Sequence, residues 1–195
     1  MPRWWQWLSS PFLTRHTLRY AGLVVGLNVV AWTMIGLAGG NVLDRRLPIV
    51  LFPLSGFVIW AALAFYRRRR DTEMGFGRGL KLGAGIALAS SVVLALLIGL
   101  LAAGSADLRA RHIRVTRQLM AADRPHLETL PDGKRKYIRQ YAAVAELSAR
   151  DLVLPELLFR LVPGLFAALL GAILLRKANP EGTEPERAPR SPKQP

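Results

Sequence analysis

Long uncharged stretches separated by short charged ones make up the first half of the chain. Residues 20–43, 47–66 and 82–106 contain no Asp, Glu, Lys or Arg and are 24, 20 and 25 residues long. At about 1.5 Å per residue, about 20 helical residues cross the hydrocarbon layer of a bilayer. A core helix of a water-soluble protein has one apolar stripe, whereas residues 92–98 are apolar on every side. Three buried helices of a globular protein are the alternative, but so short a chain lacks the polar surface to cover them.

A fourth apolar block, residues 152–175, is interrupted by Glu156 and Arg160. Pro155 suits the first turn of a helix, and Glu156 beside it suits the positive end of the helix dipole. Residues 155–175 number 21, enough to span a bilayer if Arg160 reaches the interface. We therefore expect an all-α protein, a bundle of four transmembrane helices. Their expected ranges are residues 20–42, 47–66, 82–104 and 155–175.

The first apolar stretch has a second interpretation as a cleaved signal peptide. Residues 36–38, Gly-Leu-Ala, resemble a small-residue cleavage site. However, the stretch is longer than the usual apolar region of about 7–15 residues, and it begins only at residue 20. We therefore expect it to remain as the first span.

The ends of the chain differ in composition from the expected membrane domain, residues 18–177. Residues 1–17 hold three of the five tryptophans, and tryptophan prefers the headgroup layer of a membrane. We expect an interfacial anchor there, with a disordered leader as the alternative. Residues 178–195 are rich in proline and lack apolar residues, so this tail is expected to be disordered.

Residues 105–154, between the third and fourth expected spans, have the spacing of two amphipathic helices. The first ends before Arg124-Pro125, and Pro131 and Gly133 favour a tight turn after it. The second is expected to end near Leu154, because a residue before proline is biased away from helix. The apolar stripes are Leu108, Ile113, Val115, Leu119 and Met120, then Tyr137, Ile138, Tyr141, Val144, Ala145 and Leu147. We expect an extracytoplasmic helical hairpin on the membrane surface or on the bundle.

Basic charge predicts the orientation. The chain has 27 Lys and Arg against 13 acidic residues, a net charge of +14, and its tightest cluster is Arg67, Arg68, Arg69 and Arg70. Short loops rich in Lys and Arg stay in the cytoplasm, so alternation places both termini there. Residues 107–151 would then lie outside with 10 basic and 6 acidic residues, an exception that long loops permit.

The partner that this charge favours is the bilayer itself. Basic residues that flank spans contact anionic lipid headgroups. A nucleic-acid partner is disfavoured, because the sequence has neither zinc-finger spacing nor the aromatic pattern of RNA-binding domains. Helix contacts could also support a homo- or hetero-oligomer.

Residues that usually carry chemistry are sparse. The chain has no cysteine, which excludes disulfides, thiolate metal sites and a cysteine nucleophile. Its three histidines are isolated, and the glycines at 75, 77 and 79 lack the spacing of a phosphate loop. We expect no metal, no cofactor and no enzymatic activity.

Small and kinking residues within the expected spans predict close helix contacts. Gly22 and Gly26, like Gly79 and Gly83, have a spacing that lets helices approach. Pro53 and residues 163–164, Pro-Gly, are expected to kink the second and fourth spans.

Polar residues at membrane depth are the remaining candidates for a site. Asn28 and residues 90–91, Ser-Ser, suit hydrogen bonds between helices. Glu156 and Arg160 stand four residues apart, with the acid first, and can pair on one helix face. The pair is either an interfacial anchor or the lining of a polar pocket or ion path. The other expected spans hold no ionisable residue, which disfavours a proton relay.

Two segments resemble a known family. They are residues 53–68, Pro-Leu-Ser-Gly-Phe-Val-Ile-Trp through Tyr-Arg-Arg, and residues 74–83, Met-Gly-Phe-Gly-Arg-Gly-Leu-Lys-Leu-Gly. With four spans and a helical insert before the last, the chain resembles the DUF4199 family of bacterial membrane proteins, a domain of unknown function, over roughly residues 15–177. The resemblance implies a small multi-pass protein of the bacterial inner membrane and carries over no catalytic residue.

Two functional hypotheses follow. The first is a non-catalytic membrane protein that acts through packing and interaction. The alternative is a transporter-like protein that handles a small solute or lipid through Glu156, Arg160 and Asn28.

Overall fold

The computed structural model describes residues 11–44, 46–69, 74–129 and 131–176, and the regular elements in this part of the chain are all helices, without a strand. The all-α prediction is therefore confirmed. The elements are α2 (Pro11–Leu37), α3 (Leu47–Val50), α4 (Phe52–Arg69), α5 (Phe76–Gly104), α6 (Ala106–Glu128), α7 (Gly133–Ala145) and α8 (Ala149–Leu175). Residues 1–10 of the expected anchor and the whole tail expected to be disordered, residues 178–195, lie outside the described residues, whereas residues 11–17 belong to α2.

Three of the described helices are long and apolar enough to cross a membrane. They are Thr14–Leu37 within α2, Phe76–Gly104 (α5) and Ala149–Leu175 (α8). The expected second span, residues 47–66, is instead divided into α3 and α4. The division falls beside Pro53, which has no N–H to donate to the carbonyl four residues earlier. Pro53 therefore stands in the first turn of α4, where proline is tolerated, and does not kink the middle of a longer helix.

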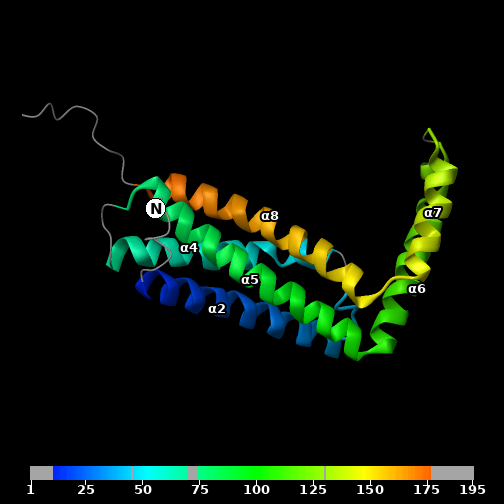
Figure 1. Cartoon of the computed structure of the whole chain (residues 1–195), viewed down its shortest axis with the longest axis horizontal. Coiled ribbons are helices and arrows are strands. Elements are labelled where there is room, and N and C mark those ends of the chain that lie inside the picture. The colour runs from blue at the N-terminus through cyan, green and yellow to red at the C-terminus, as the bar shows by residue number, and fades with distance from the viewer. Residues whose placement is uncertain (1–10, 45, 70–73, 130, 177–195) are drawn as a thin grey trace, which may run out of the picture.

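The long helices lie side by side and alternate in direction (Figure 1). α5 packs against α8, α2 and α4, and α4 also packs against α8. The last turn of α4, with Arg67, Arg68 and Arg69, lies at the end of the bundle where α2 and α5 begin and α8 finishes. Arg70 lies outside the described residues. The α6–α7 hairpin is at the opposite end, so the arginines and the hairpin are separated by the length of the bundle.

Small residues let α5 and α8 approach closely. A Cβ added at Gly83 would lie 2.7 Å from the Cβ of Ala168, and one at Gly79 would lie 3.4 Å from Ala172. The predicted role of Gly79 and Gly83 as a packing face therefore agrees with their position. Gly22 and Gly26 do not have this role among the described residues, because an added Cβ would meet nothing within 4 Å at either position. Spacing alone does not show which face of a helix meets a neighbour.

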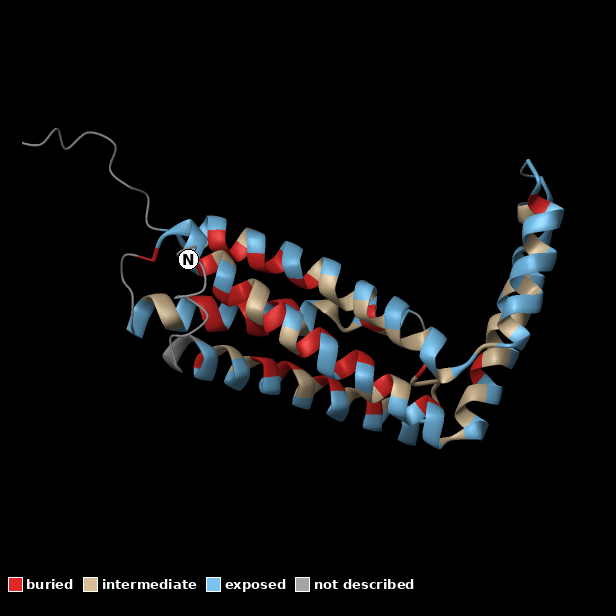
Figure 2. Ribbon diagram, in the orientation of Figure 1, coloured by how far each residue is buried: buried red, intermediate tan, exposed pale blue. Residues whose placement is uncertain are grey.

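Figure 2 shows buried residues along the axis of the bundle and exposed residues on its outside. Ile59, Leu63, Ile86 and Leu94 are almost fully buried. Large apolar side chains nevertheless face outward on each long helix, including Met34, Phe57, Leu100, Val162 and Leu174, all more than 60% exposed. Exposed apolar surface on this scale is unfavourable in water and favourable in lipid. The protein is a membrane protein.

The boundaries around the last helix differ from the prediction. α8 begins at Ala149, so Pro155 lies inside the helix and not in its first turn. The second helix of the hairpin ends at Ala145 and not near Leu154. Asp151 explains the start of α8, because its carboxylate accepts hydrogen bonds from the backbone N–H (2.8 Å) and the hydroxyl (2.6 Å) of Ser148. A carboxylate in the first turn also interacts favourably with the helix dipole.

The predicted hairpin is present, and arginine–tyrosine stacking joins its two helices. α6 continues through Pro125 to Glu128, although we expected it to end before Arg124, and α7 follows a turn in which Asp132 has a positive φ of 58°. The guanidinium of Arg117 lies 4.8 Å from the ring centroid of Tyr141, and that of Arg124 lies 5.5 Å from the ring of Tyr137. These contacts replace the aliphatic core that such short helices would otherwise need.

Candidate functional site

Arg160 and Glu156 form an ion pair on α8. The Nε of Arg160 donates to the Oε1 of Glu156 at 2.6 Å, and Nη2 lies 2.6 Å from the same oxygen. The two side chains are only 6% and 13% exposed. A buried charge without a partner is strongly unfavourable, and here each charge lies directly against the opposite one. The structure thus brings together the two residues that their spacing predicted to pair.

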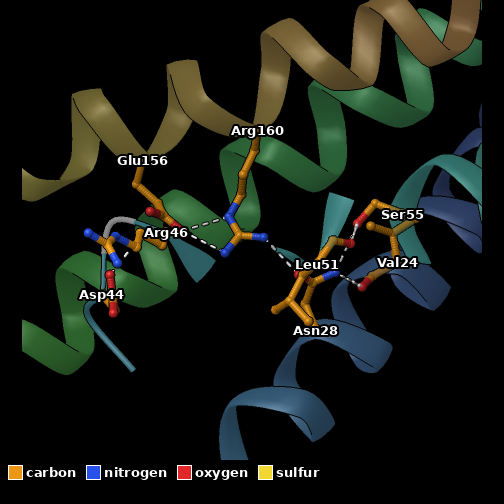
Figure 3. Close-up of polar contacts among 8 residues, drawn as sticks. All are labelled: Val24, Asn28, Asp44, Arg46, Leu51, Ser55, Glu156 and Arg160. Carbon is orange, nitrogen blue, oxygen red and sulfur yellow. Dashed lines mark hydrogen bonds and ion pairs between the residues drawn. The ribbon is translucent and has the colours of Figure 1, made fainter. Parts of the chain in front are cut away.

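Asn28 on α2 joins this pair from across the bundle (Figure 3). Its Oδ1 accepts a hydrogen bond from the Nη1 of Arg160 at 2.7 Å. Its Nδ2 donates to the carbonyl of Val24 at 2.9 Å and to the hydroxyl of Ser55 at 3.2 Å, and Ser55 in turn donates to the carbonyl of Leu51. Asn28 is fully buried. One connected polar cluster therefore links α2, α4 and α8.

Trp32, which was not among the residues expected at the site, completes the cluster. The Arg160 guanidinium lies 5.1 Å from the Trp32 ring, and Trp32 is 4% exposed. Cation–π contacts are strongest when both groups are shielded from water. Trp32 follows Asn28 by four residues, so the two share one face of α2. That spacing could have identified Trp32, whereas nothing in the sequence pointed to Ser55.

A small cavity lies beside the cluster. It has a volume of about 20 Å³ and is lined by Ser55, Ser90, Ser91, Arg160 and neighbouring apolar residues. A water molecule needs about 10–15 Å³ on a comparable measure, so the cavity has room for about one water and not for an organic solute. Ser90 does not bond across helices as expected, because its hydroxyl donates to Ile86 and Ala87 of its own helix.

The histidines are placed apart from this cluster. His16 is buried near the other end of the bundle, where a ring nitrogen lies 3.5 Å from the carbonyl oxygen of Ala62, and His126 is exposed on α6. His112 is buried on α6, and burial lowers its pKa, although the negative charge of Asp44 acts in the opposite direction. No group of three or more His, Cys, Asp or Glu side chains suited to a metal occurs among the described residues.

The cluster is therefore neutral overall, and its charged groups and its amide contact one another. Its positive and negative charges are paired, and its amide is bonded to a guanidinium, a hydroxyl and a carbonyl. The network joins α2, α4 and α8 through polar contacts, and its buried charges carry a desolvation cost that their pairing counteracts.

Comparison with known proteins gives a family and no described activity. No curated protein and no solved structure matches the chain. The model of one family, described as "Protein of unknown function (DUF4199)", matches residues 20–177. This range contains α4, α5, α8, the hairpin, α2 from residue 20 onward and all members of the polar cluster. The chain belongs to the DUF4199 family.

Proposed function

We propose that the protein is a non-catalytic, four-span protein of the bacterial inner membrane that acts by packing and by interaction. The single observation that carries the proposal is the closed polar cluster. Arg160 is bonded to Glu156 and Asn28, and the adjoining cavity has room for about one water. A site for substrate turnover or transport needs accessible polar groups and a larger cavity, whereas Arg160, Asn28 and Trp32 are buried and the cavity beside them is small.

In addition to α2, α5 and α8, the bilayer is crossed by α3 and α4 together, which form the second span along the chain. Residues 47–66 are uncharged and helical except at Leu51, and 20 helical residues cover about 30 Å. Both pieces also pack against α8, and the indole of Trp60 on α4 donates to the carbonyl of Ala167 at 2.7 Å. This packing supports a span that crosses the bilayer beside the other three.

The termini are cytoplasmic in this proposal, and the hairpin is extracytoplasmic. The placement of Arg67, Arg68 and Arg69 at the end opposite the hairpin supports this orientation, because short loops rich in arginine remain inside. Anionic lipid headgroups are the expected partners of the basic residues at both ends.

The orientation is tested with single cysteines, which the native chain lacks. Arg69→Cys and Lys136→Cys are suitable because both residues are exposed. Gly133 is unsuitable, since a Cβ there would collide with the carbonyl oxygen of Leu127. In intact spheroplasts, an impermeant maleimide should label Cys at position 136 and reach position 69 only after lysis. Labelling of both positions from one side would contradict the proposal.

A second candidate, a small-solute or lipid handler, is favoured by one observation. Asn28, Arg160 and Glu156 were proposed for that role from the sequence, and they lie in one cluster. Thermal unfolding of the purified protein with a panel of small solutes and lipids separates the two candidates. If the protein acts by packing, no solute or lipid should shift the unfolding midpoint saturably in a way that depends on Arg160. A saturable shift that Arg160→Gln abolishes would favour the handler.

A further inference from the structure

One face of α6 packs against the bundle in the first turns of the helix. This contact determines the direction in which the rest of the face points. Leu108 packs against the buried core of the bundle, and His112 is only 8% exposed. The charge of Asp44, in the connection between α2 and α3, acts on His112. The first turns of α6 therefore turn this face toward the end of the bundle.

The same face continues along α6 beyond those turns. The residues on this face follow one another at intervals of four, three, four, three and four positions, starting from Leu108. This average spacing of about 3.5 residues keeps side chains on one side of a helix. Its members are Leu108, His112, Val115, Leu119, Ala122 and His126. Leu119 is 47% exposed, and Ala122 and His126 are also exposed. The second half of the face is thus uncovered.

The other helix of the hairpin does not cover this face. α7 packs where Arg117 and Arg124 stack on Tyr141 and Tyr137. At about 100° per residue, these arginines lie about 140–160° around the α6 axis from Leu119. The Leu119 face and the α7 contact are therefore on different sides of α6.

The direction of α6 relative to the bundle decides what the face meets. Figure 1 shows that α6 and α7 run crosswise to the long helices and extend beyond the edge of the bundle next to α8. When the bundle stands in a bilayer, a helix in this position runs along the membrane surface. The face of α6 that packs on the bundle at Leu108 and His112 then points toward lipid where it extends beyond the bundle, at Leu119 and Ala122.

The charge of the hairpin selects the kind of lipid. Residues 106–145 contain nine Lys and Arg and four Asp and Glu. Arg111 is exposed and lies about 80° around the α6 axis from Leu119, on the flank of the Leu119 face. Long basic side chains beside an apolar stripe bind the headgroup layer of anionic membranes, where the stripe enters the acyl boundary and the charges stay at the phosphates.

We propose that α6 lies in the headgroup layer of an anionic leaflet, with the face of Val115, Leu119 and Ala122 embedded and the basic residues of the hairpin on the lipid phosphates. The inference rests on the proposed function, because it needs the bundle to stand in a bilayer. It adds a lipid-binding surface outside the four spans and assigns the side of α6 that makes it.

The test uses the full chain with a single bimane-labelled cysteine in nanodiscs of equal parts phosphatidylcholine and phosphatidylglycerol. Leu119→Cys reports on the proposed face. Ala121→Cys is the matched control, because it is exposed on the same helix about 200° away. Leu96→Cys, on the exposed side of α5, reports on whether the bundle is in lipid at all.

A nitroxide near the lipid headgroup should quench the label at 119 several-fold more than the label at 121, and acrylamide in water should show the reverse order. Exchange of phosphatidylglycerol for phosphatidylcholine should raise acrylamide quenching at 119 several-fold. Equal quenching at 119 and 121 overturns the inference, as does shielding of 119 from both quenchers, which would indicate a protein partner. If quenching of the label at 119 is the same with and without phosphatidylglycerol, the preference for anionic lipid is overturned. Failure of acyl-chain nitroxides to quench the label at 96 would instead contradict the membrane bundle.

Discussion

Arg160 on α8 donates a hydrogen bond of 2.7 Å to Asn28 on α2, two residues that are 132 positions apart in the chain. Both side chains lie between helices whose outer surfaces are apolar, so the bond closes within the protein and not in water. The bond joins the first and the last of the described long helices through a polar contact.

Loss of the Arg160 charge should destabilise the protein more than loss of the whole pair. Arg160→Gln leaves the Glu156 carboxylate in a largely buried position without its cation, and removal of one partner of a buried ion pair costs about 3–5 kcal/mol. The double variant Glu156→Gln, Arg160→Gln has no unpaired charge. Thermal unfolding in detergent should therefore rank wild type above the double variant and the double variant above Arg160→Gln. Equal midpoints for the two variants would show that the pair does not act as a buried unit.

Two glycine substitutions on different faces should have opposite effects. Gly83→Ala places a Cβ 2.7 Å from the Cβ of Ala168 and 3.1 Å from its Cα, so α5 and α8 must separate, at a cost of about 1–3 kcal/mol. Gly22→Ala meets nothing within 4 Å and should be neutral or more stable by about 0.5–1 kcal/mol, because alanine restricts the unfolded chain. The comparison is made by unfolding midpoints of both variants in the same detergent. A similar loss at both positions would mean that the α5–α8 seam is not the tight contact.

The start of α8 should depend on Asp151. Asp151→Ala removes the acceptor of both hydrogen bonds from Ser148, and loss of such a cap costs about 0.5–2 kcal/mol. Faster amide hydrogen exchange is expected over residues 149–153, with the middle of α8 unchanged. Ser105→Ala is the matched control, because the Ser105 hydroxyl caps α6 by accepting from the N–H of Leu108. Its effect should be confined to the start of α6.

The docking of α6 on the bundle should weaken in acid through His112. Burial lowers the pKa of His112 below its ordinary value of 6.5 in the folded protein, so the unfolded or undocked chain binds the proton more readily. Stability is then complete above about pH 6.5 and is lost as the pH falls through the lowered pKa of the folded state. Hydrogen exchange at residues 106–115, measured at neutral and acid pH, should show this opening. His112→Gln should remove that part of the pH dependence, and an unchanged profile would exclude His112 as its source.

Much of the architecture follows from the sequence because membrane helices are determined by local composition. An uncharged run of 20 residues or more has few alternatives to a helix in lipid, so the all-α fold and the approximate positions of α2 and α5 could be predicted. The position of α8 followed from a mostly apolar block that Glu156 and Arg160 interrupt. The spacing of Glu156 and Arg160 likewise predicts their pairing, since residues four apart share a helix face. The division at Pro53 and the boundary at Ser148 were within reach of the same local rules, through the missing N–H and the capping carboxylate.

The tertiary structure decided the rest, because spacing shows which residues share a face and not what that face meets. Gly22 and Gly83 have the same local spacing, yet only Gly83 lies against another helix. Asn28, Ser55 and Trp32 gather around Arg160 only because α2, α4 and α8 pack together. In the same way, the apolar stripe of α6 is local, but the crosswise direction that turns it toward the membrane depends on how α6 leaves α5 and packs on the end of the bundle.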